Sequence, residues 1–342
     1  MKEILMALSR GESLSEQTAQ EAMHLMMSGL ASPAQIAAYL TLLQTKGETI
    51  DELTGSVRAM REHAVPLSVP YEDLLDTCGT GGDHAGTFNI STAAAFVLAA
   101  GSVHVAKHGN RAASSQTGSA DVLAELGISL DLTPEQAQRC LHQTGFCFLF
   151  AQTYHPAMKH VAPIRKELGF RTMFNFLGPL TNPARPTYQV LGTPSVMVAK
   201  KMAHVLAKLG STQALVLHAA DGLDELSISG PSYIYEVKGE TVTSYSVTPD
   251  DFGLATHSLQ AIAGGNSREN ADIIMGIFSG EKGAKRDVVV MNAAAGFYAA
   301  NCVTSYKEGA RLAQKLIDDK KVLEKLREVQ SFTQNLSEGL LA

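Results

Sequence analysis

Four glycines lie within eight residues of the chain: Gly79, Gly81, Gly82 and Gly86. Glycine at this density lets backbone N–H groups converge on an anion, because no Cβ obstructs their approach. The loop follows the apolar pair Leu74-Leu75, and Asn89, Ser91 and Thr92 then precede the apolar run Ala93–Ala100. Such side chains are typical of a helix start, whose unpaired N–H groups and positive dipole end attract anions. The pattern predicts a strand, a phosphate-binding loop and a helix whose N-terminus points at the loop.

A second polar cluster follows the next short apolar stretch, and its members are Lys107, His108, Gly109, Asn110, Arg111, Ser114, Ser115 and Ser119. Two anion-binding elements so close in sequence indicate one ligand that carries more than one phosphate. The glycine loop is not a P-loop, because no Gly-Lys-Ser/Thr follows it. It is not a dinucleotide fingerprint either, since Cys78–Asp83 lacks the Gly-x-Gly-x-x-Gly spacing.

A third candidate is the acidic sequence Asp221–Glu225 (DGLDE), which follows the predicted strand Leu215–Leu217. Open α/β sheets place ligands beyond the carboxyl ends of their strands. The adjacent carboxylates of Asp224 and Glu225 repel each other unless a cation lies nearby, and oxygen ligands of this kind suit Mg²⁺. On spacing alone an acidic surface turn is the commoner explanation. The phosphate-binding loop elsewhere in the chain needs a counter-cation, and this favours the metal site.

The segment Tyr154–Arg171 combines prolines with basic residues. We expect a helix that begins at His155-Pro156 and bends at Pro163, because proline removes a backbone hydrogen bond inside a helix. Its three cations, Arg165, Lys166 and Arg171, could be solvated surface charges, which is the usual state of such residues.

The elements that would position these groups fall into two parts. Residues 1–65 show three helix starts, at Ser15, at Ser32-Pro33 and at Thr49, and predict a small helical domain. The segment 165–185 is expected to cross back to it.

Beyond the proline-punctuated stretch 65–70, residues 71–342 alternate strands with helices, which predicts a mainly parallel sheet covered by helices on both faces. We expect strands near 74–77, 103–106, 146–151, 188–191, 214–218 and 234–237, and one charged helix face over 315–327.

Composition agrees with an enzyme that is neither secreted nor membrane-bound. The 342 residues carry a net charge of −6, which argues against a general nucleic-acid binder. The four cysteines have no Cys-x-x-Cys spacing and the N-terminal residues lack a signal-peptide apolar core, so we expect reduced thiols in the cytoplasm. The most apolar late segment, Val288–Val303, is interrupted by two asparagines and is better explained as a buried helix than as a membrane span.

The sequence resembles the anthranilate phosphoribosyltransferases over nearly its whole length. Five motifs carry the resemblance in order: DTCGTGGD (Asp76–Asp83), FNIST (Phe88–Thr92), KHGNRAASSQTGSADVL (Lys107–Leu123), RKELGFRTMFNFLGPLTNPA (Arg165–Ala184) and DGLDELS (Asp221–Ser227). Thr117 and Ala124 depart from the family pattern beside the phosphate-binding segment, where serine and glutamate are common, and they bear on affinity rather than on the reaction. The resemblance implies a homodimer and the fold shared with pyrimidine nucleoside phosphorylases.

The resemblance implies transfer of the phosphoribosyl group of 5-phosphoribosyl diphosphate (PRPP) to the amine of anthranilate, which releases diphosphate and is the second step of tryptophan biosynthesis from chorismate. It assigns the two polar clusters to PRPP: Gly79, Gly82, Asp83, Thr87, Asn89, Ile90, Ser91, Thr92, Lys107, His108, Gly109, Asn110, Arg111, Ala112, Ala113, Ser114, Ser115 and Ser119. Within PRPP, Asp83 could contact the ribose hydroxyls instead of a phosphate, because its charge disfavours phosphate.

The same resemblance assigns anthranilate to Gly79, Asn110 and Arg165, with His108 and His155 lining the pocket. It implies Mg²⁺, two ions per subunit, held by Asp224 and Glu225 with the Ser91 hydroxyl as a further ligand to one ion. No catalytic side chain is assigned, because the acceptor amine is already a neutral nucleophile.

Two alternatives stay open at this point. A pyrimidine nucleoside phosphorylase-like enzyme shares the implied fold, but the Asp224-Glu225 pair and Arg165 disfavour it. A non-catalytic, nucleic-acid-binding relative of the fold is disfavoured by the net negative charge and by the intact GTGGD, NIST, KHGNR and DGLDE sequences.

Overall fold

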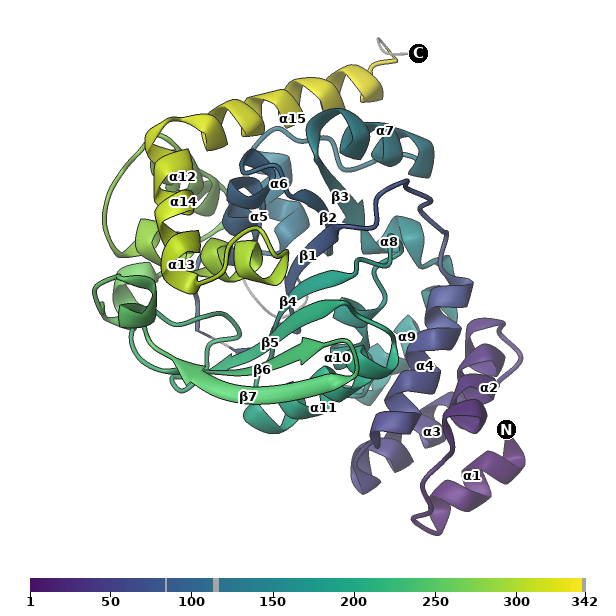
Figure 1. The fold of residues 1–342 in the computed structure, drawn as a ribbon. Coiled ribbons are helices and arrows are strands. Elements are labelled where there is room, and N and C mark those ends of the chain that lie inside the picture. Colours follow the sequence, from purple (N-terminus) through teal and green to yellow (C-terminus); the bar gives the residue numbers. More distant parts are fainter. Residues whose placement is uncertain (84, 113–116, 340–342) are drawn as a thin grey trace.

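A computed structural model describes residues 1–83, 85–112 and 117–339 (Figure 1). Three of the predicted PRPP-binding residues, Ala113, Ser114 and Ser115, lie outside the described residues. No helix within the described residues has the length and apolar composition needed to cross a membrane. The four cysteines are free thiols, and only Cys302 is exposed.

The N-terminal part is helical, as predicted, with α1 (Lys2–Ser9), α2 (Glu16–Met27), α3 (Pro33–Lys46) and α4 (Ile50–His63). The Ser15 side chain caps α2 by accepting a hydrogen bond from the backbone N–H of Thr18. Ser32 and Thr49 complete capping boxes at the starts of α3 and α4. The three predicted helix starts are therefore confirmed.

The larger part contains one seven-stranded sheet in the order β3-β2-β1-β4-β5-β6-β7. Its strands are β1 (Leu74–Gly79), β2 (His104–Gly109), β3 (Phe146–Phe150), β4 (Tyr188–Gly192), β5 (Gln213–Ala219), β6 (Ser232–Lys238) and β7 (Thr241–Val247). The first five in that order are parallel, and β6 and β7 are antiparallel. The predicted α/β class with a mainly parallel sheet is confirmed.

Helices surround this sheet in Figure 1. They are α5 (Ile90–Ala100), α6 (Ser119–Glu125), α7 (Pro134–Thr144), α11 (Val196–Lys208), α12 (Ser267–Phe278), α13 (Ala284–Ala299), α14 (Tyr306–Asp318) and α15 (Lys321–Ser337). The apolar α5 and α13 lie in one large buried cluster, which confirms α13 as a buried helix. The charged run 315–327 was expected on one helix face. It spans α14 and α15 instead, because the helical conformation is interrupted at Lys320, whose φ is +62°.

The segment that follows β3 differs from the prediction. Instead of one helix bent at Pro163, the chain forms α8 (Ala151–Tyr154), the 3₁₀ turn η1 (Pro156–His160) and a separate α9 (Ala162–Leu168). Pro163 lies in the first turn of α9, where the missing N–H costs nothing. Four further short elements complete the chain: α10 (Phe174–Leu177), η2 (Gly178–Leu180), η3 (Pro249–Phe252) and η4 (Leu259–Ile262).

The buried side chains form two large clusters on the two sides of the sheet. The first joins α5 and α13 to strand residues such as Val105 and Leu217. The second joins α2–α4 to α9, α10 and α11 and to strand residues such as Leu191 and Val216. The helical part thus shares its core with the segment that contains α9 and α10. The domain boundaries at 65 and 71 stay a prediction.

Candidate active site

The carboxyl ends of β1 and β4 meet at the point where the strand order reverses. Consecutive strands β1, β2 and β3 run toward one edge of the sheet, and β4 then returns to pair with β1 on its other side. Gly79 ends β1 and lies opposite Gly192, which ends β4. Such a reversal opens a crevice that binds ligands in open α/β sheets.

The acidic loop, Asp221–Glu225, follows β5 and lies over this crevice. Gly79 and Gly192 leave room for it: a Cβ at Gly192 would lie 1.5 Å from the Asp224 carbonyl oxygen, and one at Gly79 would lie 2.5 Å from Asp224 Oδ2. The backbone N–H of Gly81 donates to Asp224 Oδ2 at 2.8 Å. The two sequence-distant motifs are therefore in direct contact.

Positive backbone φ angles shape the glycine loop. Gly81, Gly82 and Gly86 have φ values of +68°, +81° and +65°, which favour glycine over all other residues. The loop is fixed on its far side by the N–H of Gly264, which donates to the Gly86 carbonyl at 2.9 Å, and by a β-bridge between Thr87 and Ala263. Glycine is thus favoured at all three positions by conformation, and at Gly82 also by space, because a Cβ there would lie 2.7 Å from the Arg171 guanidinium.

Arg171 holds the loop by its carbonyl groups. Its guanidinium donates to the carbonyls of Gly81 at 3.0 Å and Gly82 at 3.4 Å. These bonds occupy carbonyl oxygens at the turn of the loop. Sequence reasoning offered Arg171 as an ordinary surface charge. The side chain is exposed, but it is a structural part of the site.

The N-terminus of α5 faces the other acidic side chain. The Ser91 N–H donates to Glu225 Oε1 at 3.2 Å. Asn89 occupies the N-cap position without capping the helix; its amide donates to the Thr117 carbonyl at 3.3 Å, and its oxygen accepts from Asn270 at 3.1 Å. Ile90 and Thr92 have buried side chains. Any contact of these two residues with an anion must therefore use the backbone.

Lys107 lies inside the sheet rather than in a loop after it, because β2 extends to Gly109. Its ammonium donates to the Thr77 carbonyl and to Ser91 Oγ, the latter at 3.4 Å. Burial lowers the pKa of Lys107, while the nearby Asp76, Cys78 and Glu225 oppose that shift. The ammonium thus places a buried positive charge beneath the start of α5.

The acidic pair itself is strained electrostatically. Burial, followed by repulsion from Asp83, raises the pKa of Asp224 to about 7. Burial, followed by repulsion from Asp224, raises the pKa of Glu225 to about 8. In the part of the chain that the structure describes, no group of three or more His, Cys, Asp or Glu side chains could hold a metal. Two carboxylates and the nearby Ser91 hydroxyl still fit a cation such as Mg²⁺, which takes few protein ligands and completes its shell with water and phosphate oxygens.

Two buried histidines meet on the β2 side of the crevice. The Nε2 atoms of His108 and His155 lie 3.2 Å apart, so one ring donates an N–H hydrogen bond to the ring nitrogen of the other. Burial lowers the pKa of His108 to about 3 and that of His155 to about 4. Both rings are therefore neutral at pH 7. The Asp76 carboxylate accepts hydrogen bonds from the backbone N–H of His108 and from the Asn182 side-chain amide, and it thereby fixes the strand that carries His108.

The end of the second polar cluster is organised by Asp121, which sequence reasoning missed. Its carboxylate accepts from the N–H groups of Ala112 and Gly118 and pairs with Arg111 at 3.0 Å. The Ser119 hydroxyl donates to the Asn110 carbonyl at 3.3 Å. A Cβ at Gly109 would lie 2.2 Å from Ser119 Oγ, so glycine is needed for this approach.

Arg165 extends from α9 and stacks over Phe174, with 5.2 Å between Cζ and the ring centre. Burial lowers its pKa. Within residues 1–83, 85–112 and 117–339 its guanidinium has neither an ion pair nor a hydrogen bond. No such bond joins Arg165 to Gly79 or Asn110 in that part of the chain. A half-buried cation without an anionic partner is suited to binding a carboxylate.

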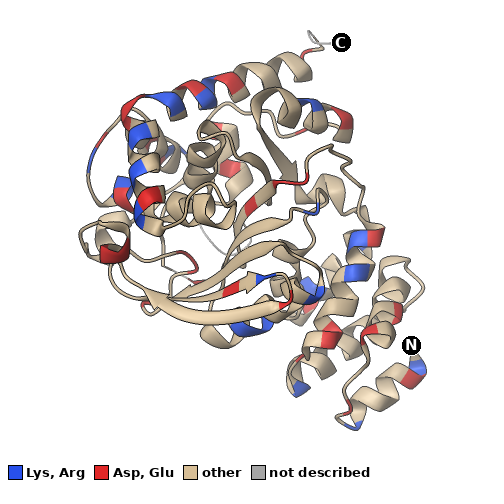
Figure 2. Cartoon of the chain, in the orientation of Figure 1, with Lys and Arg blue, Asp and Glu red and all other residues tan. Residues whose placement is uncertain are grey.

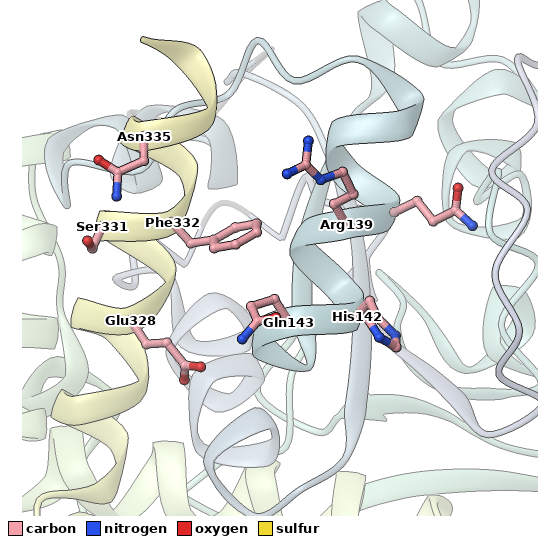
Figure 3. A pocket seen from close by; sticks show the side chains of 8 residues that line it. Arg139, His142, Gln143, Glu328, Ser331, Phe332 and Asn335 are labelled. Atoms are coloured by element: carbon pink, nitrogen blue, oxygen red, sulfur yellow. The ribbon is translucent and has the colours of Figure 1, made fainter. Parts of the chain in front are cut away.

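A large groove lies away from this crevice. A groove of about 900 Å³ runs between α7 and α15, where Arg139 and His142 face Phe332 and Glu328 (Figure 3). None of the residues predicted to bind PRPP, anthranilate or Mg²⁺ lines it. The groove between α7 and α15 is therefore separate from the candidate site at the strand ends.

Comparisons with known proteins agree with this geometry. Residues 2–64 match the helical bundle domain of a glycosyl transferase family, and residues 71–322 match the a/b domain of a glycosyl transferase family. The anthranilate phosphoribosyltransferase of Petrotoga mobilis is 48% identical over 97% of both chains, and that of Symbiobacterium thermophilum is 50% identical over 98% of both chains.

Solved structures give the same result. Anthranilate phosphoribosyltransferase from Thermus thermophilus superposes with a TM-score of 0.92 at 44% identity, covering 97% of this chain and 99% of that one. The Saccharomyces cerevisiae protein, solved in complex with PRPP and Mg, gives a TM-score of 0.87 at 27% identity over 94% of both chains. The chain therefore belongs to the anthranilate phosphoribosyltransferase family of glycosyltransferase enzymes.

Proposed function

We propose that the chain performs the reaction for which its family is named. It transfers the phosphoribosyl group of PRPP to the amine of anthranilate, giving N-(5-phosphoribosyl)anthranilate and diphosphate in the second step of tryptophan biosynthesis. The observation that carries the proposal is the contact of Gly79 and Gly81 with Asp224 at the reversal of strand order. It brings a phosphate-binding loop, a helix N-terminus and two acidic side chains into one crevice.

PRPP would lie across the glycine loop and the N-terminus of α5. Backbone N–H groups of the glycine loop and of the N-terminus of α5 suit its phosphates, and Lys107 beneath them adds positive charge. The remaining PRPP-binding assignments are those of the second polar cluster, Lys107–Ser115 with Ser119, and Asp83 on the ribose. Asp121 supports this part, because it fixes Arg111 and two backbone N–H groups.

Asp224 and Glu225, with the Ser91 hydroxyl, would hold Mg²⁺, for which we infer two ions per subunit. Bound Mg²⁺ supplies positive charge for the leaving diphosphate. The raised pKa values of both carboxyls support this role, since a buried acidic pair favours a cation or a proton. The relative from Saccharomyces cerevisiae has been solved in complex with PRPP and Mg, and a variant of it in complex with 4-fluoroanthranilate.

Anthranilate would bind beside the loop, with its carboxylate on Arg165 and its ring near Gly79 and Asn110. The neutral pair His108 and His155 can line the pocket with hydrogen-bonding groups and no charge. The amine attacks without a general base, because it is a neutral nucleophile. Rate enhancement then comes from holding the amine against the anomeric carbon and from stabilising the departing diphosphate.

The test is direct. Purified protein is incubated with PRPP, MgCl₂ and anthranilate, and the loss of anthranilate fluorescence is followed. The proposal requires loss that depends on all three additions and that disappears in the Asp224→Asn, Glu225→Gln double variant. Phosphate-dependent cleavage of a pyrimidine nucleoside in place of that loss would establish the phosphorylase alternative.

We also infer a homodimer, a cytoplasmic location and a division into a helical domain, 1–65 joined by 165–185, and an α/β domain, 71–342. The shared buried cluster of α4, α9 and α10 supports the assignment of the 165–185 segment to the helical part. Light scattering during gel filtration tests the homodimer.

A further inference from the structure

A second cavity lies at the opposite end of the sheet from the candidate active site. Its volume is about 310 Å³, and its walls include Arg58 and Arg61 of α4, Arg185 and Thr187 before β4, and Ser211 before β5. The crevice described above is at the carboxyl ends of β4 and β5, whereas this cavity is at their amino ends. It lies where α4 of the helical part meets the sheet, and Figure 2 shows basic residues along α4.

The positive charge in this cavity is only partly neutralised. Arg58 pairs with Glu16 at 2.7 Å. Arg61 uses its Nε to donate to the Leu180 carbonyl at 2.8 Å, which leaves its terminal nitrogens without a partner among the described residues. Arg185 has no side-chain hydrogen bond or ion pair to any residue that the structure describes. Two guanidiniums thus present unused donors to one small cavity.

The acidic residue in the cavity wall is already engaged. Glu62 pairs with His24 at 2.9 Å and accepts from Gln20 at 2.9 Å. Burial and the nearby Arg185 and Arg58 lower the pKa of Arg61 to about 10. Arg61 and Arg185 are therefore held near each other with no ion pair to an acidic side chain of the described residues.

The backbone supports the same conclusion. Arg185 has a φ of +50°, in the left-handed region that non-glycine residues rarely adopt. Its N–H donates to the Asn182 carbonyl at 3.0 Å, so the turn that carries Arg185 is fixed. A strained backbone that is held in place by its surroundings is a recurrent property of ligand-binding positions.

We propose that this cavity binds a phosphate-type oxyanion that joins α4 to the turns before β4 and β5. Guanidinium groups bind phosphate oxygens through paired hydrogen bonds, and Arg61 and Arg185 supply them from two different parts of the fold. The Ser211 side chain lines the same space and adds a hydroxyl. The anion cancels the repulsion between the arginines and thereby stabilises the contact between the helical part and the sheet. This inference does not depend on the reaction proposed above.

The experiment measures binding of inorganic phosphate and of diphosphate by calorimetry at constant ionic strength. All variants carry Gly82→Val, which obstructs the glycine loop and is expected to weaken binding at the proposed PRPP site. In this background we expect one phosphate site per chain. Arg185→Gln and Arg61→Gln should each weaken it by about tenfold or more, because each removes a charged hydrogen-bonding partner. The matched control is Arg311→Gln, an exposed arginine on α14 that lines neither cavity.

Circular dichroism verifies that each variant is folded. If Arg61→Gln fails to fold, Arg185→Gln decides, because the Arg185 side chain is exposed and has no protein partner in the described residues. A phosphate-dependent rise in melting temperature that Arg185→Gln abolishes and Arg311→Gln retains supports the proposal. If Arg185→Gln and Arg311→Gln lose this rise in melting temperature equally, the effect of phosphate is non-specific charge screening and the proposal is overturned. Absence of phosphate binding in the Gly82→Val background also overturns the proposal. Stronger binding of diphosphate than of phosphate identifies the diphosphate ion as the better-fitting source of the oxyanion.

Discussion

The close approach of β4 to the acidic loop makes Gly192→Ala an informative substitution, because Gly192 is not proposed to bind substrate. The added Cβ would lie 1.5 Å from the Asp224 carbonyl oxygen and 2.5 Å from its carbonyl carbon. Cβ atoms essentially never approach other heavy atoms within 3.0 Å, so the oxygen must separate from the strand by at least 1.5 Å (3.0 − 1.5). The contacts are backbone atoms, and no side-chain rotation can relieve them.

The displacement moves both acidic side chains, because Asp224 and Glu225 follow the backbone that is pushed away. A misplacement of about 1 Å costs on the order of 100-fold in rate, or about 2.7 kcal/mol of transition-state stabilisation. We therefore expect kcat/KM for PRPP to fall by at least about 100-fold. Overpacking of this kind also costs about 1–3 kcal/mol of stability, so the melting temperature should fall while the protein stays folded at 25 °C.

The assay is loss of anthranilate fluorescence at saturating and at limiting PRPP. Gly230→Ala is the matched control: the same chemical change lies in the turn before β6, and a Cβ there meets nothing within 4 Å. Gly230→Ala should keep kcat/KM within a fewfold of the wild type. A Gly192→Ala protein with wild-type kcat/KM would refute the idea that β4 sets the position of the acidic loop.

Three further predictions follow from the same site. Arg165→Ala should raise the KM for anthranilate about ten- to a hundredfold and leave PRPP binding unchanged, because a charged hydrogen bond is worth about 1.5–3 kcal/mol. Arg165→Lys should recover only part of the loss, since lysine cannot form the paired contact. Steady-state kinetics with each substrate varied checks this, and a selective loss of PRPP affinity would contradict it. In calorimetry, Gly82→Val should weaken PRPP binding far more than anthranilate binding. The reason is that the φ angle of Gly82 is +81° and a Cβ there would lie 2.7 Å from the Arg171 guanidinium. Unchanged PRPP affinity would refute the phosphate-binding role of the loop. The double variant Asp224→Asn, Glu225→Gln should lose most turnover, and its stability should depend on pH differently from that of the wild type. In the folded wild type the Asp224 and Glu225 carboxyls keep their protons up to pKa values of about 7 and 8, whereas in the unfolded chain they lose them near pH 4. The free energy of unfolding of the wild type should therefore fall as pH rises from about 5 to 8, and the double variant should lack that fall. Thermal melts across this pH range test it, and Mg²⁺ at pH 8 should raise the melting temperature of the wild type alone; identical profiles for the two proteins would contradict the assignment.

Much of the fold was predictable because the signals are local. The hydroxyl caps at Ser15, Ser32 and Thr49 mark helix starts without reference to distant residues. The meeting of the glycine loop with Asp221–Glu225 was also predictable, since both follow buried strands of a parallel sheet and such strand ends share one edge.

The features that sequence reasoning missed depend on partners far along the chain. Arg171 and Asp121 are indistinguishable from surface charges until the carbonyls or N–H groups that they bind are placed beside them. Lys107 was expected after the strand because the apolar stretch ends at Ala106, and its burial is explained by the Thr77 carbonyl and the Ser91 hydroxyl on neighbouring elements. Pro163 is compatible with a bend or with a new helix start, and tertiary packing selects the second.

Strand β7 was missed for another reason. Its sequence, TVTSYSV, offers one well-buried residue, Val247, so hydrophobic alternation hardly marks it. Its place at the edge of the sheet, hydrogen-bonded to β6 alone, allows that polarity.

The second buried cluster combines residues of the N-terminal helices with residues made much later in the chain, and this limits the order in which the chain can fold during synthesis. The first four helices emerge from the ribosome before the segments that complete their core, since Ile164, Phe174 and Leu177 are made about a hundred residues later. Arg61 likewise waits for the Leu180 carbonyl. Loop closure of this length is slow relative to local helix formation. The nascent N-terminal helices therefore expose apolar surface at least until residues 161–180 arrive, and chaperones that bind nascent chains can bind this surface.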